Sequence, residues 1–383
     1  MLSVSDVPPT AKLSQLDTIP GSNDGRPGLI RHLPLLRQLL WDGALHVQVH
    51  SATASGKSRL LPSEMAYRLP GRGKLLVLTT STVDVTGMHA DASVRSCFRM
   101  GRRKGGGAPW EQSWIVFATA GLAARWYASE GGRLWSPYSG VMFDEIDQIE
   151  RCPEYVQLWE SARQEAATRS LLVLGASATY SGEMKKTLTE QGAAWIECSE
   201  RPFPLELFVM EVPTQDELYP GVRHLLASLL GRNLTSLVFL PGKAEIAYVL
   251  DDLRKSGLPQ QALVPFHAEL EVEELRKAKC ATSYPRVVLA TNMAETSVTL
   301  PDVDVVVDLG LSRSIGSYHD LLCVEDFAAS EGAQEQRKGR AGRVKPGCSV
   351  RVQVADRVLP PSRPRAQTPW PECAHWSHTT RRF

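Results

Sequence analysis

The sequence predicts an α/β protein with two consecutive domains, each built on a largely parallel sheet. The chain of 383 residues is long enough for two ordinary domains, each with its own core. Short apolar runs alternate with helical stretches, and this alternation occurs in two successive series. A proline-containing interruption at residues 198–213 separates the two series.

The first series predicts a domain at residues 27–200. Strands are expected at residues 45–49, 74–78, 114–118, 140–143 and 171–174. Helices are expected at residues 57–67 and 154–167. Most of the apolar runs are bounded by Gly, Ser or Thr, which is typical of strands buried on both faces of a parallel sheet.

The second series predicts a domain at residues 201–356. Its strands are expected at residues 236–240, 286–289 and 303–307, with a helix at residues 243–256. Residues 1–26 contain several prolines and glycines and are expected to form a flexible lead-in. Residues 357–383, rich in Pro, Arg, Trp and His without an apolar period, are expected to be disordered.

Composition restricts the function without identifying it. The content of 43% hydrophobic and 22% charged residues is that of a soluble globular protein, and no run approaches the ~20 apolar residues of a membrane span. A net charge of +1 excludes a histone-like binder but allows a nucleic-acid motor with its contacts in one groove. Seven scattered cysteines predict neither a zinc site nor a disulfide framework, and they favour a reducing, cytoplasmic compartment with the nucleus left open.

A phosphate-binding loop is predicted between the first strand and the first helix. Residues 51–58 read Ser-Ala-Thr-Ala-Ser-Gly-Lys-Ser, in the setting that a P-loop requires. Main-chain N–H groups would face phosphate oxygens, Lys57 would reach the β- and γ-phosphates, and Ser58 would hold Mg²⁺. The expected nucleotide-binding residues of this loop are Thr53, Ala54, Ser55, Gly56, Lys57 and Ser58.

Two glycines usual in such a loop are replaced by Ser51 and Ala54. Alanine at position 54 would be strained if the loop required a positive φ there. The alternative interpretation is an ordinary polar turn that contains Gly-Lys-Ser by chance.

A carboxylate pair is predicted in the same sheet. The apolar run 141–143 ends in Asp144 and Glu145, and ligands of open α/β sheets bind at the carboxyl ends of strands. Asp144 can bind Mg²⁺ opposite Ser58, and Glu145 can orient the attacking water or accept its proton. A solvated loop or a helix cap would explain an isolated acidic pair, but it does not explain one beside a P-loop.

The other segments, in chain order, resemble the motifs of superfamily 2 helicases, specifically the DEAH/RHA and viral DExH branch. Motif V, Ala-Thr-Asn-Met-Ala-Glu-Thr-Ser, stands at residues 290–297, and motif VI, Gln-Arg-Lys-Gly-Arg-Ala-Gly-Arg, at residues 336–343. Motifs Ia, Ib, III and IV match less closely at residues 79–82, 119–122, 177–179 and 237–246. Separately, these segments could be a turn, a capped helix or an exposed basic helix, but their order favours the helicase interpretation.

The resemblance implies two tandem RecA-like P-loop NTPase domains with the nucleotide cleft between them, and ATP and Mg²⁺ as cofactors. The catalytic residues would be Lys57, Glu145, Gln336, Arg340 and Arg343. All five would also bind the nucleotide, as would Asp144. Ser177 and Thr179 would couple the ATP state to domain movement. The residues expected to contact RNA are Thr80, Thr119, Gly121, Lys243 and Thr291. The expected partner is single-stranded or partly duplex RNA, bound largely without sequence preference; no protein partner is indicated.

The sequence departs from the family pattern in three places. Residues 144–147, Asp-Glu-Ile-Asp, correspond to motif II, and Asp147 replaces its histidine, as in DEAD-box proteins, although motifs V and VI are of the DEAH type. Motif Ia lacks its usual Pro-Arg, and the basic segment 99–104 is expected to be a solvated loop, with phosphate contact as the alternative. The chain also stops about 40 residues after motif VI, which leaves no room for the accessory domains of cellular DEAH proteins.

The leading hypothesis is therefore an ATP-dependent RNA helicase or translocase, of viral or cellular origin. The alternatives are a catalytically weakened RNA-binding or scaffolding remnant and a DNA-directed motor with the same core.

Overall fold

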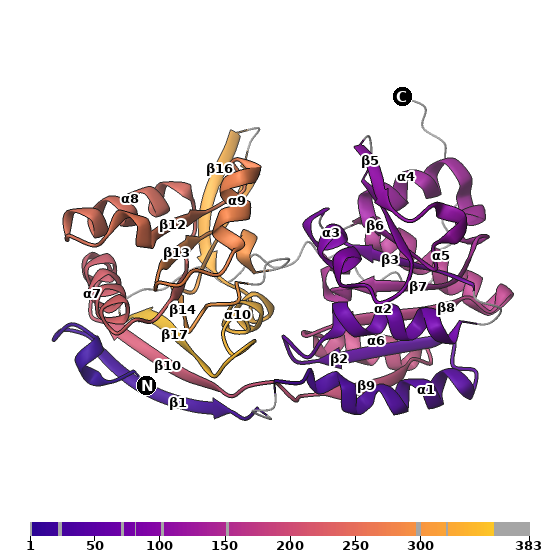
Figure 1. Cartoon of the computed structure of the whole chain (residues 1–383), viewed down its shortest axis with the longest axis horizontal. Coiled ribbons are helices and arrows are strands. Elements are labelled where there is room, and N and C mark those ends of the chain that lie inside the picture. Colours follow the sequence, from indigo (N-terminus) through magenta and orange to yellow (C-terminus); the bar gives the residue numbers. More distant parts are fainter. Residues whose placement is uncertain are drawn as a thin grey trace.

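The computed structural model describes residues 2–21, 25–69, 73–80, 82–100, 103–150, 153–295, 300–318 and 321–355. Two large sheets, each covered by helices, form two α/β domains that lie side by side (Figure 1). The predicted fold class is confirmed. The division of the domains at residue 200 stays a prediction.

The first domain has an eight-stranded sheet in the order β5-β4-β6-β3-β7-β8-β2-β9. Its strands are β2 (His46–Ser51), β3 (Lys74–Thr79), β4 (Ser96–Met100), β5 (Arg103–Gly107), β6 (Ile115–Thr119), β7 (Tyr138–Asp144), β8 (Leu172–Ser177) and β9 (Ala194–Cys198). Its helices are α1 (Leu33–Trp41), α2 (Lys57–Arg68), α3 (Thr82–Asp91), α4 (Ala120–Glu130), α5 (Pro153–Arg169) and α6 (Gly182–Glu190). All five predicted strands and both predicted helices of this domain are present, with small shifts at their ends.

Helices cover both faces of this sheet, as the uninterrupted apolar runs predict. Along β3, Leu76 and Leu78 join the core cluster formed with α4, α5 and α6, whereas Leu75 and Val77 join the cluster formed with α1, α2 and α3. The strands are parallel except for β5, which pairs antiparallel with β4 at one edge. Segment 99–104 therefore contributes to a β-hairpin rather than to the solvated loop that we expected; its residues 101 and 102 lie outside the described ranges.

The second domain has a seven-stranded sheet in the order β1-β10-β17-β14-β11-β13-β12. Its strands are β1 (Lys12–Ile19), β10 (Leu205–Val212), β11 (Ser236–Phe239), β12 (Leu263–Phe266), β13 (Val287–Ala290), β14 (Val305–Asp308) and β17 (Gly347–Val354). Its helices are α7 (Leu218–Gly231), α8 (Lys243–Lys255), α9 (Val272–Lys279) and α10 (Glu331–Lys338). A separate antiparallel hairpin, β15 (Leu311–Tyr318) and β16 (Leu321–Ala328), precedes α10. The three predicted strands and the predicted helix are present.

The expected flexible lead-in is wrong for much of residues 1–26. Strand β1 pairs antiparallel with β10 and forms one edge of the second sheet, and Figure 1 shows it running beneath that domain. Just before it, the buried carboxylate of Asp6 accepts hydrogen bonds from Ser228 and Arg232 of α7 and its C-cap. A register shift at Leu16 interrupts the alternation of inward and outward side chains along β1. The sequence therefore lacks the regular period by which a strand is predicted. The tail predicted at residues 357–383 lies outside the described residues.

Candidate nucleotide site between the two domains

The loop predicted to bind phosphate connects β2 to α2. Lys57 is buried, and its Nζ donates to the carbonyl oxygens of Ser51 at 2.8 Å and Ala52 at 3.2 Å. The Ser51 hydroxyl accepts a hydrogen bond from Ser55 Oγ at 2.9 Å. The serine that replaces the usual glycine therefore connects the first residue of the loop to a residue four positions later. Burial lowers the pKa of Lys57, and the carboxylate of Glu145 opposes that shift most strongly.

Two residues of the loop have left-handed backbone conformations. Gly56 has φ of 95°, and a Cβ there would lie 2.7 Å from Pro27 Cβ, so this position requires glycine. Ala54 has φ of 65°, so the loop does require a positive φ at this position, and the alanine that replaces the usual glycine is strained. An L-residue in this region costs about 1–2 kcal/mol, which the surrounding loop must offset.

Strand β7 places the acidic pair beside this loop. Ser58 Oγ donates to Asp144 Oδ2 at 2.8 Å, so the hydroxyl and the buried carboxylate expected to hold Mg²⁺ are in contact. The hydroxyl of Tyr155 on α5 donates to the carbonyl oxygens of Asp144 and Leu78 and thereby ties the ends of β7 and β3 together.

Glu145 follows in a left-handed conformation, with φ of 53°. Burial, and after it the charges of Asp147 and Asp144, raise the pKa of Glu145 to about 8. Its Oε2 is buried and has no hydrogen-bond partner within the described ranges. A strained, buried carboxyl group with such a pKa is typical of a site that transfers protons.

Motif VI of the second domain lies against this loop. A Cβ added to Gly339 would lie 2.1 Å from Thr53 Oγ1, so only glycine permits this approach of the two domains. The buried Arg340 directs its Nε to the Gln336 carbonyl oxygen, and Arg343 Nε donates to the Gly339 carbonyl oxygen.

The charges of the two arginines reach the first domain. The charge of Arg340 lowers the pKa of Glu145, although burial and the neighbouring carboxylates raise that pKa by more. The charge of Arg343 lowers the pKa of Lys57, in the same direction as burial. The structure therefore brings together Lys57, Glu145, Arg340 and Arg343 from both domains. Gln336 is buried one helical turn before Arg340, and its role in orienting water stays a prediction.

Comparison with known proteins agrees with this arrangement. Residues 221–345 match the family described as the helicase conserved C-terminal domain. The chain is 30% identical over 231 residues to an ATP-dependent RNA helicase HrpA homolog of Haemophilus influenzae, covering 58% of this chain and 17% of that protein. It is 38% identical over 137 residues to ATP-dependent RNA helicase HrpA of Escherichia coli, covering 35% of this chain and 10% of that protein.

A solved structure extends the similarity to both domains. The crystal structure of Escherichia coli DEAH/RHA helicase HrpB matches with a TM-score of 0.69 and 25% identity, covering 85% of this chain and 42% of that one. In sequence and in fold, the chain is therefore similar to helicases of the DExH/DEAH branch of superfamily 2. It spans less than a fifth of the length of the HrpA relatives. No helix in the described ranges is both long and apolar enough to cross a membrane.

The unusual Asp147 has a structural explanation in this fold. Ser177 Oγ and Thr179 Oγ1 of motif III donate to its two carboxylate oxygens at 2.6 and 2.8 Å. A Cβ on Gly332 of α10 would lie 3.6 Å from Thr179 Oγ1, so motif III also reaches the second domain. Asp147 was missing from the predicted site residues, although its replacement of histidine was the signal that could have identified it.

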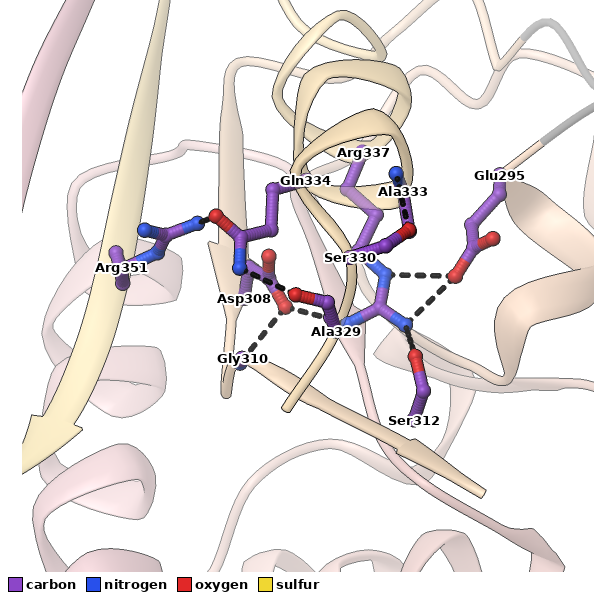
Figure 2. Close-up of polar contacts among 10 residues, drawn as sticks. All are labelled: Glu295, Asp308, Gly310, Ser312, Ala329, Ser330, Ala333, Gln334, Arg337 and Arg351. Carbon is purple, nitrogen blue, oxygen red and sulfur yellow. Dashed lines mark hydrogen bonds and ion pairs between the residues drawn. The ribbon is translucent and has the colours of Figure 1, made fainter. Parts of the chain in front are cut away.

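Sequence reasoning also missed Arg337, which is 1% exposed on α10. Its guanidinium donates to Asp308 at 2.7 Å, to Glu295 at 2.6 and 2.8 Å and to Ser312 at 3.0 Å (Figure 2). These contacts fix motif VI to the end of β14, to motif V and to β15. Residues 296–299 of motif V lie outside the described part of the chain.

The residues predicted to contact RNA form two groups. Thr80 directly follows β3, Thr119 ends the neighbouring β6, and the exposed Gly121 is the second residue of α4. In the second domain, Lys243 opens α8 just after β11, and Thr291 directly follows the neighbouring β13. Lys243 is exposed and forms an ion pair with Glu269. Each group lies at the carboxyl edge of its own sheet, and contact with RNA stays a prediction.

Proposed function

We propose that this chain is the motor core of an ATP-dependent RNA helicase or translocase, which hydrolyses ATP to ADP and phosphate and couples the reaction to movement along RNA or its unwinding. The observation that supports the proposal best is the meeting of Lys57 and Glu145 with Arg340 and Arg343 at the contact between the domains. The relatives named ATP-dependent RNA helicases support it further.

The residues divide the work of phosphoryl transfer between the domains. Lys57 binds the phosphates, and Arg340 and Arg343 stabilise the negative charge that builds up during transfer. Glu145, with its pKa near 8, accepts the proton of the attacking water. The donor set of Ser58 and Asp144 fits Mg²⁺, which would neutralise phosphate charge when bound. Because the arginines belong to the second domain, ATP favours the closed arrangement, and hydrolysis removes that preference.

RNA would lie along the carboxyl edges of the two sheets. The small and hydroxyl-bearing residues Thr80, Thr119, Gly121 and Thr291 suit contacts with the sugar–phosphate backbone, and Lys243 adds a positive charge. Such contacts carry little sequence information, and they weaken as salt concentration rises.

Phosphate release, measured with and without single-stranded RNA, tests the proposal. RNA should stimulate turnover, and Lys57→Ala and Glu145→Gln should each reduce it at least about 100-fold. Lys255→Ala is the matched control, because Lys255 is an exposed lysine of α8 whose ion-pair partner is Asp251 on the same helix. Wild-type protein that binds RNA without turnover would favour the scaffolding alternative. Stronger stimulation by DNA than by RNA would favour the DNA-directed motor.

A further inference from the structure

Arg201 lies in the segment that joins the two domains, between β9 and β10. Its side chain is 3% exposed. One terminal nitrogen donates to Thr53 Oγ1 of the phosphate-binding loop at 2.6 Å, and the other donates to the Ala341 carbonyl oxygen of motif VI at 2.7 Å. A single side chain on the connecting segment therefore bonds to both halves of the nucleotide site.

The surrounding backbone leaves space for this bridge. A Cβ on Gly342 would lie 3.1 Å from a terminal nitrogen of Arg201, which is tighter than ordinary contact. Gly339 makes the corresponding close approach to Thr53, the acceptor of the first hydrogen bond. Both glycines of motif VI therefore lie against the hydrogen-bonded pair of Arg201 and Thr53, and a larger residue at either position would crowd that pair.

The charge balance around the bridge favours a bound anion. Both acceptors of Arg201 are uncharged, and its Nε has no hydrogen-bond partner among the described residues. Burial is the main cause that lowers the pKa of Arg201 to about 10; the charge of Glu335 opposes this shift, and the charge of Arg340 adds to it. Arg201 in turn lowers the pKa of Arg343. Three clustered guanidinium groups repel one another, and a polyphosphate between the domains would relieve that repulsion.

We propose that Arg201 is a positioning residue for ATP hydrolysis. By holding the Ala341 carbonyl against Thr53, it fixes the short segment from which Arg340 and Arg343 extend. The two arginines then face the phosphates only when the connecting segment has this conformation. Arg201 thereby makes the geometry of the connecting segment a condition for turnover. This inference rests on the proposed function, because it assigns Arg201 a role in the same reaction.

The central experiment compares Arg201→Met and Arg201→Lys with the wild type. The control is Arg286→Lys, because Arg286 is equally buried in the second domain but bonds Asp302, away from the nucleotide site. Displacing catalytic groups by about 1 Å can cost about 100-fold in rate. We expect kcat to fall by about that factor in Arg201→Met, while KM for ATP stays within about threefold, since Lys57 and its loop are intact. Arg286→Lys should lower thermal stability without changing kcat.

A double-mutant comparison separates positioning from general destabilisation. If Arg201 acts through the motif VI arginines, adding Arg201→Met to the Arg343→Ala variant should not lower its kcat any further. Additive losses, or an equal loss of kcat in Arg286→Lys, would overturn the inference.

A second readout does not depend on turnover. Small-angle scattering with ADP–beryllium fluoride should show compaction of the wild type and less compaction of Arg201→Met. Thr53→Val, which removes the acceptor and keeps the buried charge, should resemble Arg201→Met. Compaction of both variants equal to that of the wild type would refute the inference, even if the wild type proved inactive. A wild type that compacts without RNA-stimulated turnover would refute the proposed function and leave the bridge supported.

Discussion

Replacement of Arg337 by methionine should destabilise the second domain by several kcal/mol. The guanidinium is buried and bonds two carboxylates, of which Asp308 is 6% and Glu295 12% exposed at the side chain. Methionine fills similar space but leaves both carboxylates without this partner. Removing one partner of a buried ion pair costs about 3–5 kcal/mol, which is a large fraction of the ~5–15 kcal/mol that stabilise a typical domain. For a domain of this size, the melting temperature should fall by roughly 10 °C.

Urea unfolding followed by circular dichroism measures this effect in the transition of the second domain. Arg223→Met is the matched control, since Arg223 is 41% exposed and bonds a single carboxylate, Asp252, at 3.2 Å. Such a pair contributes about 1 kcal/mol or less. Adding Asp308→Asn to Arg337→Met should restore part of the stability, because it removes one unpaired charge. A loss in Arg337→Met no larger than in Arg223→Met would refute the reasoning.

Three further changes test separate parts of the first domain. Tyr155→Phe leaves two buried carbonyls without their donor and should lower the free energy of unfolding by about 1–3 kcal/mol, whereas Tyr67→Phe, at an exposed tyrosine, should change it by less than about 0.5 kcal/mol. Burial lowers the pKa of His46 from 6.5 to about 4, so the unfolded chain takes up a proton between these values and stability falls as pH falls through this window. Between pH 7 and pH 5 the wild type should lose about 2 kcal/mol more than His46→Gln in urea unfolding, and equal losses would contradict the assigned cause. Asp147→Ala removes the acceptor of both motif III hydroxyls and should lower RNA-stimulated phosphate release about tenfold. Unchanged stimulation in that variant would show that the contact does not couple ATP to RNA.

Local sequence pattern was sufficient for the parts of the fold that depend on short-range chemistry. The phosphate-binding loop and the acidic pair were predictable because strand, turn and helix follow one another within a few residues. The strain at Ala54 was foreseeable for the same reason, since a missing glycine indicates where a positive φ is needed. Predicting that motif VI of the second domain meets the first domain required the order of the motifs along the chain as well as the residues within each motif.

The residues that were missed act over long sequence separations or through an unexpected chemistry. Arg201 bonds groups 148 and 140 positions away, and nothing in its local segment indicates those partners. Arg337 bonds Asp308 and Glu295, 29 and 42 positions away. Asp147 was read as a departure from the family pattern, whereas its carboxylate satisfies two hydroxyl donors. Strand β1 was missed because it is an exposed edge with an irregular period.

The pairing of β1 with β10 also determines the order in which the molecule can be completed. During synthesis, β1 is made before the first sheet, but its partner strand is made only after the whole of that sheet; Asp6 and Ser228, which bond across the same region, are 222 positions apart. The first domain can therefore fold on the ribosome while β1 is still unpaired. Closing so long a loop makes this pairing a late step, and an unpaired edge strand is prone to aggregation. A fragment that starts at residue 27 would leave β10 as the new exposed edge of the second sheet.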